Sequence, residues 1–211
     1  TEAGTIGFAL AVEALAGSCA STAVTVSVSN MVAEVIQAVG SDEQKALYLP
    51  RLTGGTYSAG GFCLTEASAG SDPSAMKTRA VKDGNHYVLN GAKLYITSAE
   101  YAGVFVVWAV TDPDAPKGKG ISCFLVEADT PGLVIGKAEK KMGQTGSATN
   151  EVLFQDCRVP ATAMLGPENG GFRIAVGELA GGRIGIASLA LGIGRKAMAA
   201  GSAYIKERQQ F

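Results

Sequence analysis

The sequence is poor in histidine and in unbalanced charge, and each scarcity excludes a class of function. The only histidine, His86, lies in a predicted turn with no cluster of candidate ligands near it, which excludes a His-rich metal site. The formal net charge is −1 and the 18 Lys and Arg residues are scattered along the chain. This pattern gives no electrostatic basis for binding nucleic acid or an anionic membrane.

Closely spaced cysteines and long apolar runs are also missing. The four cysteines, at positions 19, 63, 123 and 157, include no CxxC spacing, which predicts free and mostly buried thiols in a reducing compartment. No run of about 18 uncharged apolar residues occurs, which argues against a membrane span. No basic segment precedes the apolar residues 5–20, so a signal peptide is not indicated. Both chain ends interrupt helical patterns and are interpreted as cuts through a larger protein.

Residues 1–55 are predicted to form part of an N-terminal helical domain. Apolar side chains recur at helical spacing over residues 31–39. A capping box that begins at Ser41 predicts a second helix over residues 42–49, and Pro50 is expected to end it.

Residues 56–160 are predicted to form an antiparallel β-barrel or sandwich. Asp83-Gly84 and Asn90-Gly91 are strong hairpin signals. They predict a meander of three short strands at residues 77–82, 86–89 and 92–97. Further strand patterns follow without long helices between them, at residues 104–110, 121–127, 133–140 and 151–156.

Residues 161–211 are predicted to begin a C-terminal helical domain, so the fold class is α+β multidomain. This region has glycines where a helix interior would lose up to about 1 kcal/mol each relative to alanine. They indicate either close approach of a ligand or backbone, or tight packing in a helical bundle. The glycines concerned are Gly181, Gly182, Gly185, Gly192 and Gly194.

The most informative segment is residues 62–72, FCLTEASAGSD. This pattern is typical of a strand that is followed by a loop of small and hydroxyl-bearing residues. Such a loop offers backbone N–H groups and hydroxyls to a phosphate or a planar heteroaromatic ring. By composition alone, an ordinary turn is the favoured interpretation.

The sequence of this segment resembles the acyl-CoA dehydrogenase signature C-x-T-E-x-x-x-G-S-D. Four further segments resemble the same family, in order along the chain. Residues 90–97 are similar to its N-G-x-K-x-W-I-T segment, and residues 143–154 to its M-G-x-x-x-S segment and following strand. Residues 165–172 resemble the entry to its C-terminal helical domain, and residues 181–187 and 207–211 resemble the helix that follows.

The resemblance implies FAD as the cofactor and assigns two segments to its binding. Residues along the flavin would be Phe62, Cys63, Leu64, Thr65, Gly70 and Ser71, with the Thr65 hydroxyl near the ring. Tyr95, Ile96 and Thr97 would pack beside the isoalloxazine, and Thr97 would hydrogen-bond near its reactive edge. Arg208, Gln210 and Phe211 would reach the flavin of a neighbouring subunit, which implies a homotetramer or homodimer.

The resemblance also assigns substrate contacts. Ser71 would touch the acyl-CoA, and the CoA channel would be lined by Ala180, Gly181, Gly182 and Arg183, with Arg183 as its main polar contact. The chain departs from the family at two of these positions. Tyr95 stands where the family commonly has Trp, which keeps an aromatic face. Ala180 stands where it often has Asp, which puts one polar contact to the pantetheine in doubt.

The implied reaction is α,β-dehydrogenation of a short or branched acyl-CoA to a trans-2-enoyl-CoA. A carboxylate removes an α-proton while the β-hydrogen leaves as hydride to flavin N5. The usual base is a Glu expected beyond residue 211. A minority of the family places it at the position of Gly182, which cannot serve, and Glu178 one turn earlier is a poor substitute. No catalytic residue is therefore predicted in the chain, and these residues alone are expected to be inactive. Glu66 is interpreted as structural.

The implied electron acceptor is electron-transferring flavoprotein, and the implied compartment is the bacterial cytoplasm or the mitochondrial matrix. Three other hypotheses stay open. One is a flavoenzyme of the same fold with another outcome, such as an acyl-CoA oxidase or a nitroalkane oxidase. The second is a homologue that binds acyl-CoA or a partner without catalysis. The third, a structural β-barrel with helices, is disfavoured by the ordered motifs.

Overall fold

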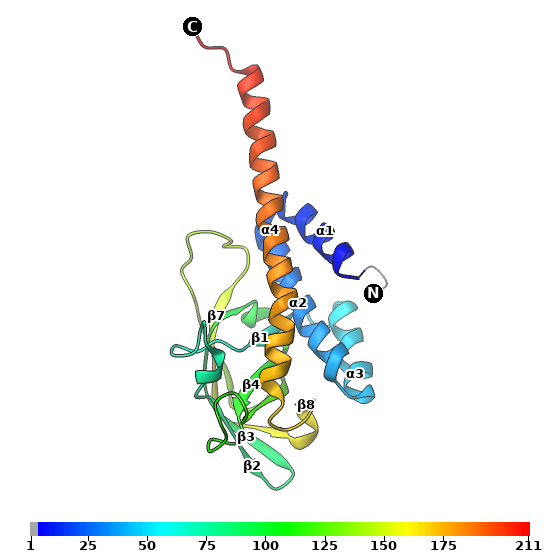
Figure 1. Cartoon of the computed structure of the whole chain (residues 1–211), viewed down its shortest axis with the longest axis vertical. Coiled ribbons are helices and arrows are strands. Elements are labelled where there is room, and N and C mark those ends of the chain that lie inside the picture. Colours follow the sequence, from blue (N-terminus) through cyan, green and yellow to red (C-terminus); the bar gives the residue numbers. More distant parts are fainter. Residues whose placement is uncertain (1–3) are drawn as a thin grey trace.

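The structure of the protein is a computed structural model that describes residues 4–211, and in it helices flank a curled sheet (Figure 1). The first three residues of the predicted N-terminal domain lie outside the described part. The described helices are α1 (Gly4–Ala16), α2 (Ala20–Val39), α3 (Asp42–Thr53) and α4 (Gly171–Glu207). The described strands are β1 (Ala59–Cys63), β2 (Arg79–Asp83), β3 (His86–Thr97), β4 (Ala102–Val110), β5 (Ile121–Glu127), β6 (Leu133–Ala138), β7 (Thr149–Pro160) and β8 (Met164–Leu165).

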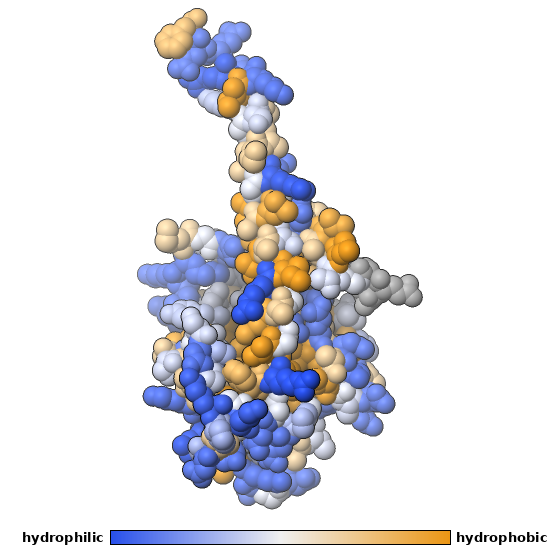
Figure 2. Space-filling model, in the orientation of Figure 1, coloured by the Kyte–Doolittle hydropathy of each residue, from blue (hydrophilic) through white to orange (hydrophobic). Residues whose placement is uncertain are grey.

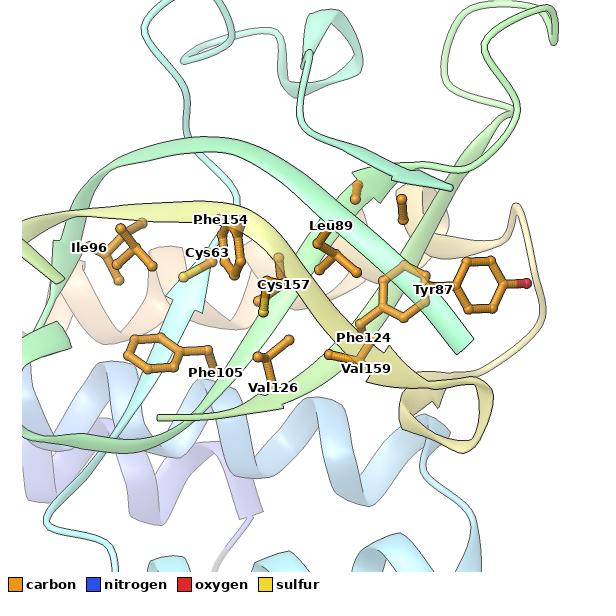
Figure 3. Close-up of a cluster of buried hydrophobic side chains, with 14 of the residues drawn as sticks. Cys63, Tyr87, Leu89, Ile96, Phe105, Phe124, Val126, Phe154, Cys157 and Val159 are labelled. Carbon is orange, nitrogen blue, oxygen red and sulfur yellow. The ribbon is translucent and has the colours of Figure 1, made fainter. Parts of the chain in front are cut away.

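The strands form one mixed sheet in the order β6-β7-β3-β2-β4-β5-β8, and β1 pairs with β4. The sheet curls so that β3 and β7 face β4 and β5 across an apolar core (Figure 3). Side chains that fill this core include Leu89, Ile96, Phe105, Phe124 and Phe154. The β-domain predicted for this region is confirmed. The expectation that it is antiparallel throughout is wrong, because β1 joins β4 in parallel.

One of the two predicted hairpins is wrong. Asp83 pairs with His86 across a turn in which Gly84 has φ +59°, as expected. β3 instead continues through Asn90 and Gly91, where its register against β7 shifts. Gly91 has φ +150°, and a Cβ there would lie 2.5 Å from Thr78 Oγ1. The glycine therefore serves a β-bulge rather than a turn, and both uses favour glycine for the same backbone freedom.

α3 begins as the sequence predicts and ends later. Ser41 Oγ accepts from the Gln44 amide at 3.2 Å, and the Gln44 side chain accepts from the Ser41 amide at 2.9 Å. The prediction that Pro50 ends the helix is wrong, since α3 continues to Thr53. Proline has no amide hydrogen to donate, but its carbonyl still accepts from Gly54 N at 2.8 Å.

Helices α2 and α4 cover the outer face of the sheet (Figure 1). The expected helical spacing over residues 31–39 is confirmed, because it becomes the buried face of α2. The Trp108 indole of β4 donates to Gly171 O at 2.8 Å, which attaches the beginning of α4 to the sheet. Before α4 begins, β8 pairs with β5. The boundary between the β-domain and the C-terminal helical domain, at residue 160, stays a prediction.

Three of the α4 glycines lie where α1 and α2 pack against it. A Cβ at Gly182 would meet the Met31 side chain at 2.8 Å, and one at Gly185 would meet Ser27 Oγ at 2.5 Å. A Cβ at Gly192 would lie 2.1 Å from Glu13 O, a backbone atom of α1. Tight helix packing therefore explains these positions. Gly194 has open space instead.

Among residues 4–211, α2 and α4 are long and apolar enough to cross a membrane by length and composition alone. Part of this apolar surface is used in packing, as the buried faces of both helices show. The C-terminal half of α4 extends beyond the rest of the described chain (Figure 1), and apolar side chains are exposed along the helix among polar ones (Figure 2). The large exposed ones on α4 are Val176, Ile184, Ile186, Leu191, Ile193, Met198, Tyr204 and Ile205.

Gly192→Ala is expected to lower the free energy of unfolding by about 1–3 kcal/mol, because its methyl group would overpack the contact with α1. Gly194→Ala is the matched control. It adds the same methyl group where nothing lies within 4 Å, so stability should rise by up to about 1 kcal/mol. Urea unfolding followed by circular dichroism measures both. Equal effects of the two substitutions would contradict the packing explanation.

Candidate functional site

Two of the family-like segments, residues 62–71 and 90–97, are hydrogen-bonded to each other. Leu94 N donates to Thr65 O at 2.9 Å instead of to the β7 ladder. The loop after β1 is therefore attached to β3 beside Tyr95. Residues that the sequence separates by a whole hairpin thus form one continuous surface.

A third segment, residues 143–147, joins this surface through α2. Thr25 Oγ1 of α2 donates to Ser147 Oγ at 3.0 Å, and Ser98 N donates to Ala148 O at 2.8 Å. The sequence analysis missed Thr25 because it belongs to no motif. α2 also packs against α4, and Leu64 of the predicted flavin segment shares a buried cluster with Ala175 of α4.

Tyr95 is the main exposed aromatic side chain of this surface. Its side chain is 63% exposed and its backbone has φ +59°. β3 pairs Lys93 with Val152 and Ile96 with Asn150, so two β3 residues face one β7 residue and a bulge results. A left-handed backbone is strained for a bulky residue, and such strain concentrates at functional sites. The bulge presents the ring where the sequence predicts the flavin.

Other predicted flavin residues direct their side chains into the interior. Cys63 and Ile96 lie among the core side chains, as Figure 3 shows, and Leu64 is buried against the helices. Burial raises the pKa of the Cys63 thiol to about 12, so it stays protonated. Phe62 packs on Trp108 with ring centroids 4.5 Å apart. Contacts of Cys63, Leu64 and Ile96 with a cofactor would have to use their backbones.

The remaining residues fit a flavin by their chemistry. Thr65 and Thr97 are half-buried and carry hydroxyls, and Gly70 and Ser71 are exposed. Together with the Tyr95 ring, they combine an aromatic face with polar groups suited to the edge of a heterocycle and to a phosphate. Among residues 4–211, no group of three His, Cys, Asp or Glu side chains is arranged to bind a metal.

Glu66 forms a buried ion pair with Lys93 directly behind this surface. Lys93 Nζ lies 2.8 Å from Glu66 Oε1, and the Lys93 side chain is 0% exposed. Burial alone would raise the pKa of the Glu66 carboxyl. The Lys93 charge and hydrogen bonds from Lys93, Thr78 and Lys77 outweigh burial, so the pKa is lowered and the group is ionised. The geometry agrees with the structural role predicted for Glu66. The sequence analysis did not identify Lys93 as a site residue. Lys93 is nevertheless buried on β3 in the same alternating pattern as Tyr87 and Leu89.

The predicted CoA segment lies on α4 and is partly covered. Gly182 is buried beneath Met31, while Ala180 and Arg183 are exposed and Gly181 is half-buried. Arg208, Gln210 and Phe211 are exposed beyond the end of α4, where the chain extends away from the sheet (Figure 1). They make no contact with the segments of the β-domain within this chain. The structure therefore brings together the predicted flavin residues of the β-domain but not those at the C-terminus.

A pair of carboxyl groups at the α2–α4 contact was not foreseen. Burial, and then the nearby Glu34 carboxylate, raise the pKa of Glu178 to about 8. Glu34 also accepts from Asn30 Nδ2 at 2.9 Å, and a Cβ at Gly181 would lie 3.5 Å from Glu34 Oε2. Glu178 thus keeps its proton near neutral pH. No sequence signal joins these two glutamates, because only the packing of the helices brings them together.

Known proteins match the whole chain. Residues 1–56 match the N-terminal domain of acyl-CoA dehydrogenases and residues 61–157 match their middle domain. The mitochondrial short/branched chain specific acyl-CoA dehydrogenase of Rattus norvegicus is 46% identical over 100% of this chain and 48% of its own length.

Two solved structures are similar over 98% of the chain. Butyryl-CoA dehydrogenase from Megasphaera elsdenii has a TM-score of 0.95 and 44% identity, with 54% of its chain covered. A glutaryl-CoA dehydrogenase from Mycobacterium smegmatis in complex with FADH2 has a TM-score of 0.90 and 36% identity, with 52% of its chain covered. The chain spans about half the length of these relatives.

Stability is expected to fall as the pH rises from about 4.5 towards about 8, because Glu178 is easier to ionise unfolded than folded. Below the unfolded pKa the carboxyl is neutral in both states and the contribution is complete. Glu178→Gln, which keeps a neutral side chain at every pH, should flatten this part of the profile. Urea midpoints at several pH values test it, and Glu168→Gln, in the segment between β8 and α4, is the control. A profile unchanged by Glu178→Gln would refute the assignment.

Proposed function

Because the chain belongs to the acyl-CoA dehydrogenase family, we propose that the protein containing it is a FAD-dependent acyl-CoA dehydrogenase for short or branched acyl thioesters. The observation that carries this proposal is the surface formed by residues 62–71 and 95–97 around the exposed Tyr95. The substrate class is supported by the similarity to a short/branched chain specific acyl-CoA dehydrogenase and to butyryl-CoA dehydrogenase. The cofactor is supported by the similarity to a glutaryl-CoA dehydrogenase in complex with FADH2.

FAD, when bound, supplies the acceptor for the hydride that leaves the β-carbon. The residues of this chain would bind and orient the cofactor and the substrate. Tyr95 would stack on the flavin, and the hydroxyls of Thr65 and Thr97 would hydrogen-bond to its polar edge. Ser71 and the exposed loop backbone around it would contact the phosphates or the thioester. The curled sheet behind them would exclude water from one side of the ring.

The substrate would lie along the beginning of α4, with Arg183 as the polar contact to CoA. The proposal places the base outside residues 1–211, since Gly182 has no side chain. The protonated Glu178 lies at the α2–α4 contact and is not assigned to proton abstraction. Electron-transferring flavoprotein as acceptor is also part of the proposal. So are a homotetramer or homodimer in which Arg208, Gln210 and Phe211 reach the neighbouring flavin, and a bacterial cytoplasmic or mitochondrial matrix location.

The full-length protein is expected to carry oxidised flavin, and butyryl-CoA or isobutyryl-CoA should bleach its visible absorbance without oxygen. Bleaching reports hydride transfer, and comparing the two thioesters tests the preference for branching. Bound flavin without bleaching would remove the short-chain assignment and favour another outcome on the same fold, with a nitroalkane as the next substrate to try. A protein that takes up no added FAD would leave the non-catalytic homologue.

Tyr95→Ala is expected to weaken FAD binding roughly tenfold, since an aromatic stacking contact and its buried area are lost. Tyr95→Trp should keep wild-type affinity because it restores an aromatic face. Tyr101→Ala is the matched control, because Tyr101 is also exposed, at 59%, but lies outside the proposed site. Titration of the apoprotein with FAD, followed by flavin fluorescence, measures the three. If Tyr95→Ala binds FAD as Tyr101→Ala does, the stacking role is refuted.

A further inference from the structure

The Glu66–Lys93 pair has more hydrogen bonds than a simple ion pair. Glu66 Oε2 accepts from Lys77 N at 2.6 Å, and Glu66 Oε1 accepts from Thr78 N at 3.0 Å and from Lys93 Nζ at 2.8 Å. Lys93 Nζ also donates to Leu64 O at 3.2 Å, with Met76 Sδ at 3.9 Å. Apart from the Met76 sulfur, every partner is therefore a backbone group of the segment between β1 and β2, or the other member of the pair.

A gain in stability does not explain why the protein buries this ion pair. Removing two charges from water costs about as much as their attraction returns, and apolar replacements of buried pairs are often neutral or stabilising. Lys93 is 0% exposed and Glu66 7% exposed, so the desolvation cost applies in full. A buried set of directional hydrogen bonds does, however, hold the groups that it joins in one defined arrangement.

The groups joined here are the two segments that the proposed function assigns to the flavin. Glu66 lies within residues 62–71, and its bonds to Lys77 N and Thr78 N tie this loop to the residues just before β2. Lys93 is the last β3 residue in register with β7 before the bulge that turns Tyr95 outward. The adjacent Leu94 N–Thr65 O bond continues the same connection. The loop and the bulge therefore cannot move independently while the pair is intact.

We propose that Lys93 and Glu66 are positioning residues that set the loop of residues 62–71 and the Tyr95 bulge in the mutual geometry needed to bind the flavin. This inference rests on the proposed function, because it takes FAD as the ligand of that surface. Neither side chain reaches the surface, so the pair acts through Thr65 and Tyr95.

The test is the double substitution Lys93→Met with Glu66→Gln in the full-length protein. It removes both charges together and leaves no uncompensated ion in the interior, and the glutamine carbonyl still accepts one amide hydrogen. We expect a folded protein that binds FAD about tenfold more weakly or worse. The visible circular dichroism of its bound flavin should also differ from that of the wild type. A purely structural role would move thermal stability without changing this spectrum.

Two control variants separate positioning from general destabilisation. Phe124→Leu loosens the core away from this surface and should lower stability while leaving FAD affinity and the flavin spectrum unchanged. Asp83→Asn with Arg158→Met removes an exposed ion pair at the other end of β2 and should also leave them unchanged. If this double variant is not recovered folded, Lys93→Gln with Glu66→Gln, which also leaves no buried charge, is measured in the same way, with a several-fold weaker affinity expected.

The outcomes distinguish the inference from the function on which it rests. Wild-type FAD affinity and an unchanged flavin spectrum in the Lys93 and Glu66 variants would overturn the positioning role while the proposed cofactor stands. A wild-type protein that takes up no FAD would overturn the proposed function and this inference with it. Weaker binding in these variants with normal binding in both controls supports the inference.

Discussion

The described structure depends on β4 being buried on both of its faces. Phe105 and Val107 point into the core of the curled sheet, while Val106 and Trp108 point towards α2 and α4. A strand in this position has no solvent side, so its sequence is a continuous apolar run instead of an alternating one. The parallel pairing with β1 brings the loop of residues 62–71 out beside it. The hydrogen bond from the Trp108 indole to Gly171 O attaches the beginning of α4 to the sheet.

The α1–α2–α4 contact imposes a second constraint, which is close approach of helices. Gly182, Gly185 and Gly192 lie where any side chain would meet α1 or α2, so the loss of helix propensity at these positions is offset by packing. The same closeness brings Glu178 near Glu34 and retains a proton there. The contact that explains the glycines also covers Gly182, which has no side chain to act as a base.

The candidate site combines strain at its surface with a satisfied ion pair behind it. Tyr95 adopts a backbone conformation that a tyrosine rarely has, and the bulge that requires it begins immediately after Lys93. Such strain persists only where the surrounding contacts determine the backbone. The Glu66–Lys93 pair, the loop amides and the β7 ladder supply those contacts. The proposed flavin surface would thereby be preorganised by residues that do not touch the ligand.

The sequence by itself determined the elements whose causes are local, together with the family. The capping box at Ser41 and the Asp83-Gly84 turn depend on neighbouring residues, and the ordered motifs indicated both the fold and the segments of the candidate site. Only the tertiary structure decided that Asn90-Gly91 forms a bulge, that α3 continues past Pro50, and that Cys63 and Ile96 face the interior. It also decided the partners of Lys93 and Glu178. The physical reason is that these outcomes depend on atoms brought close by strand pairing and helix packing, such as Thr78 against Gly91 and Glu34 against Glu178, whereas sequence patterns report only the preferences of adjacent residues.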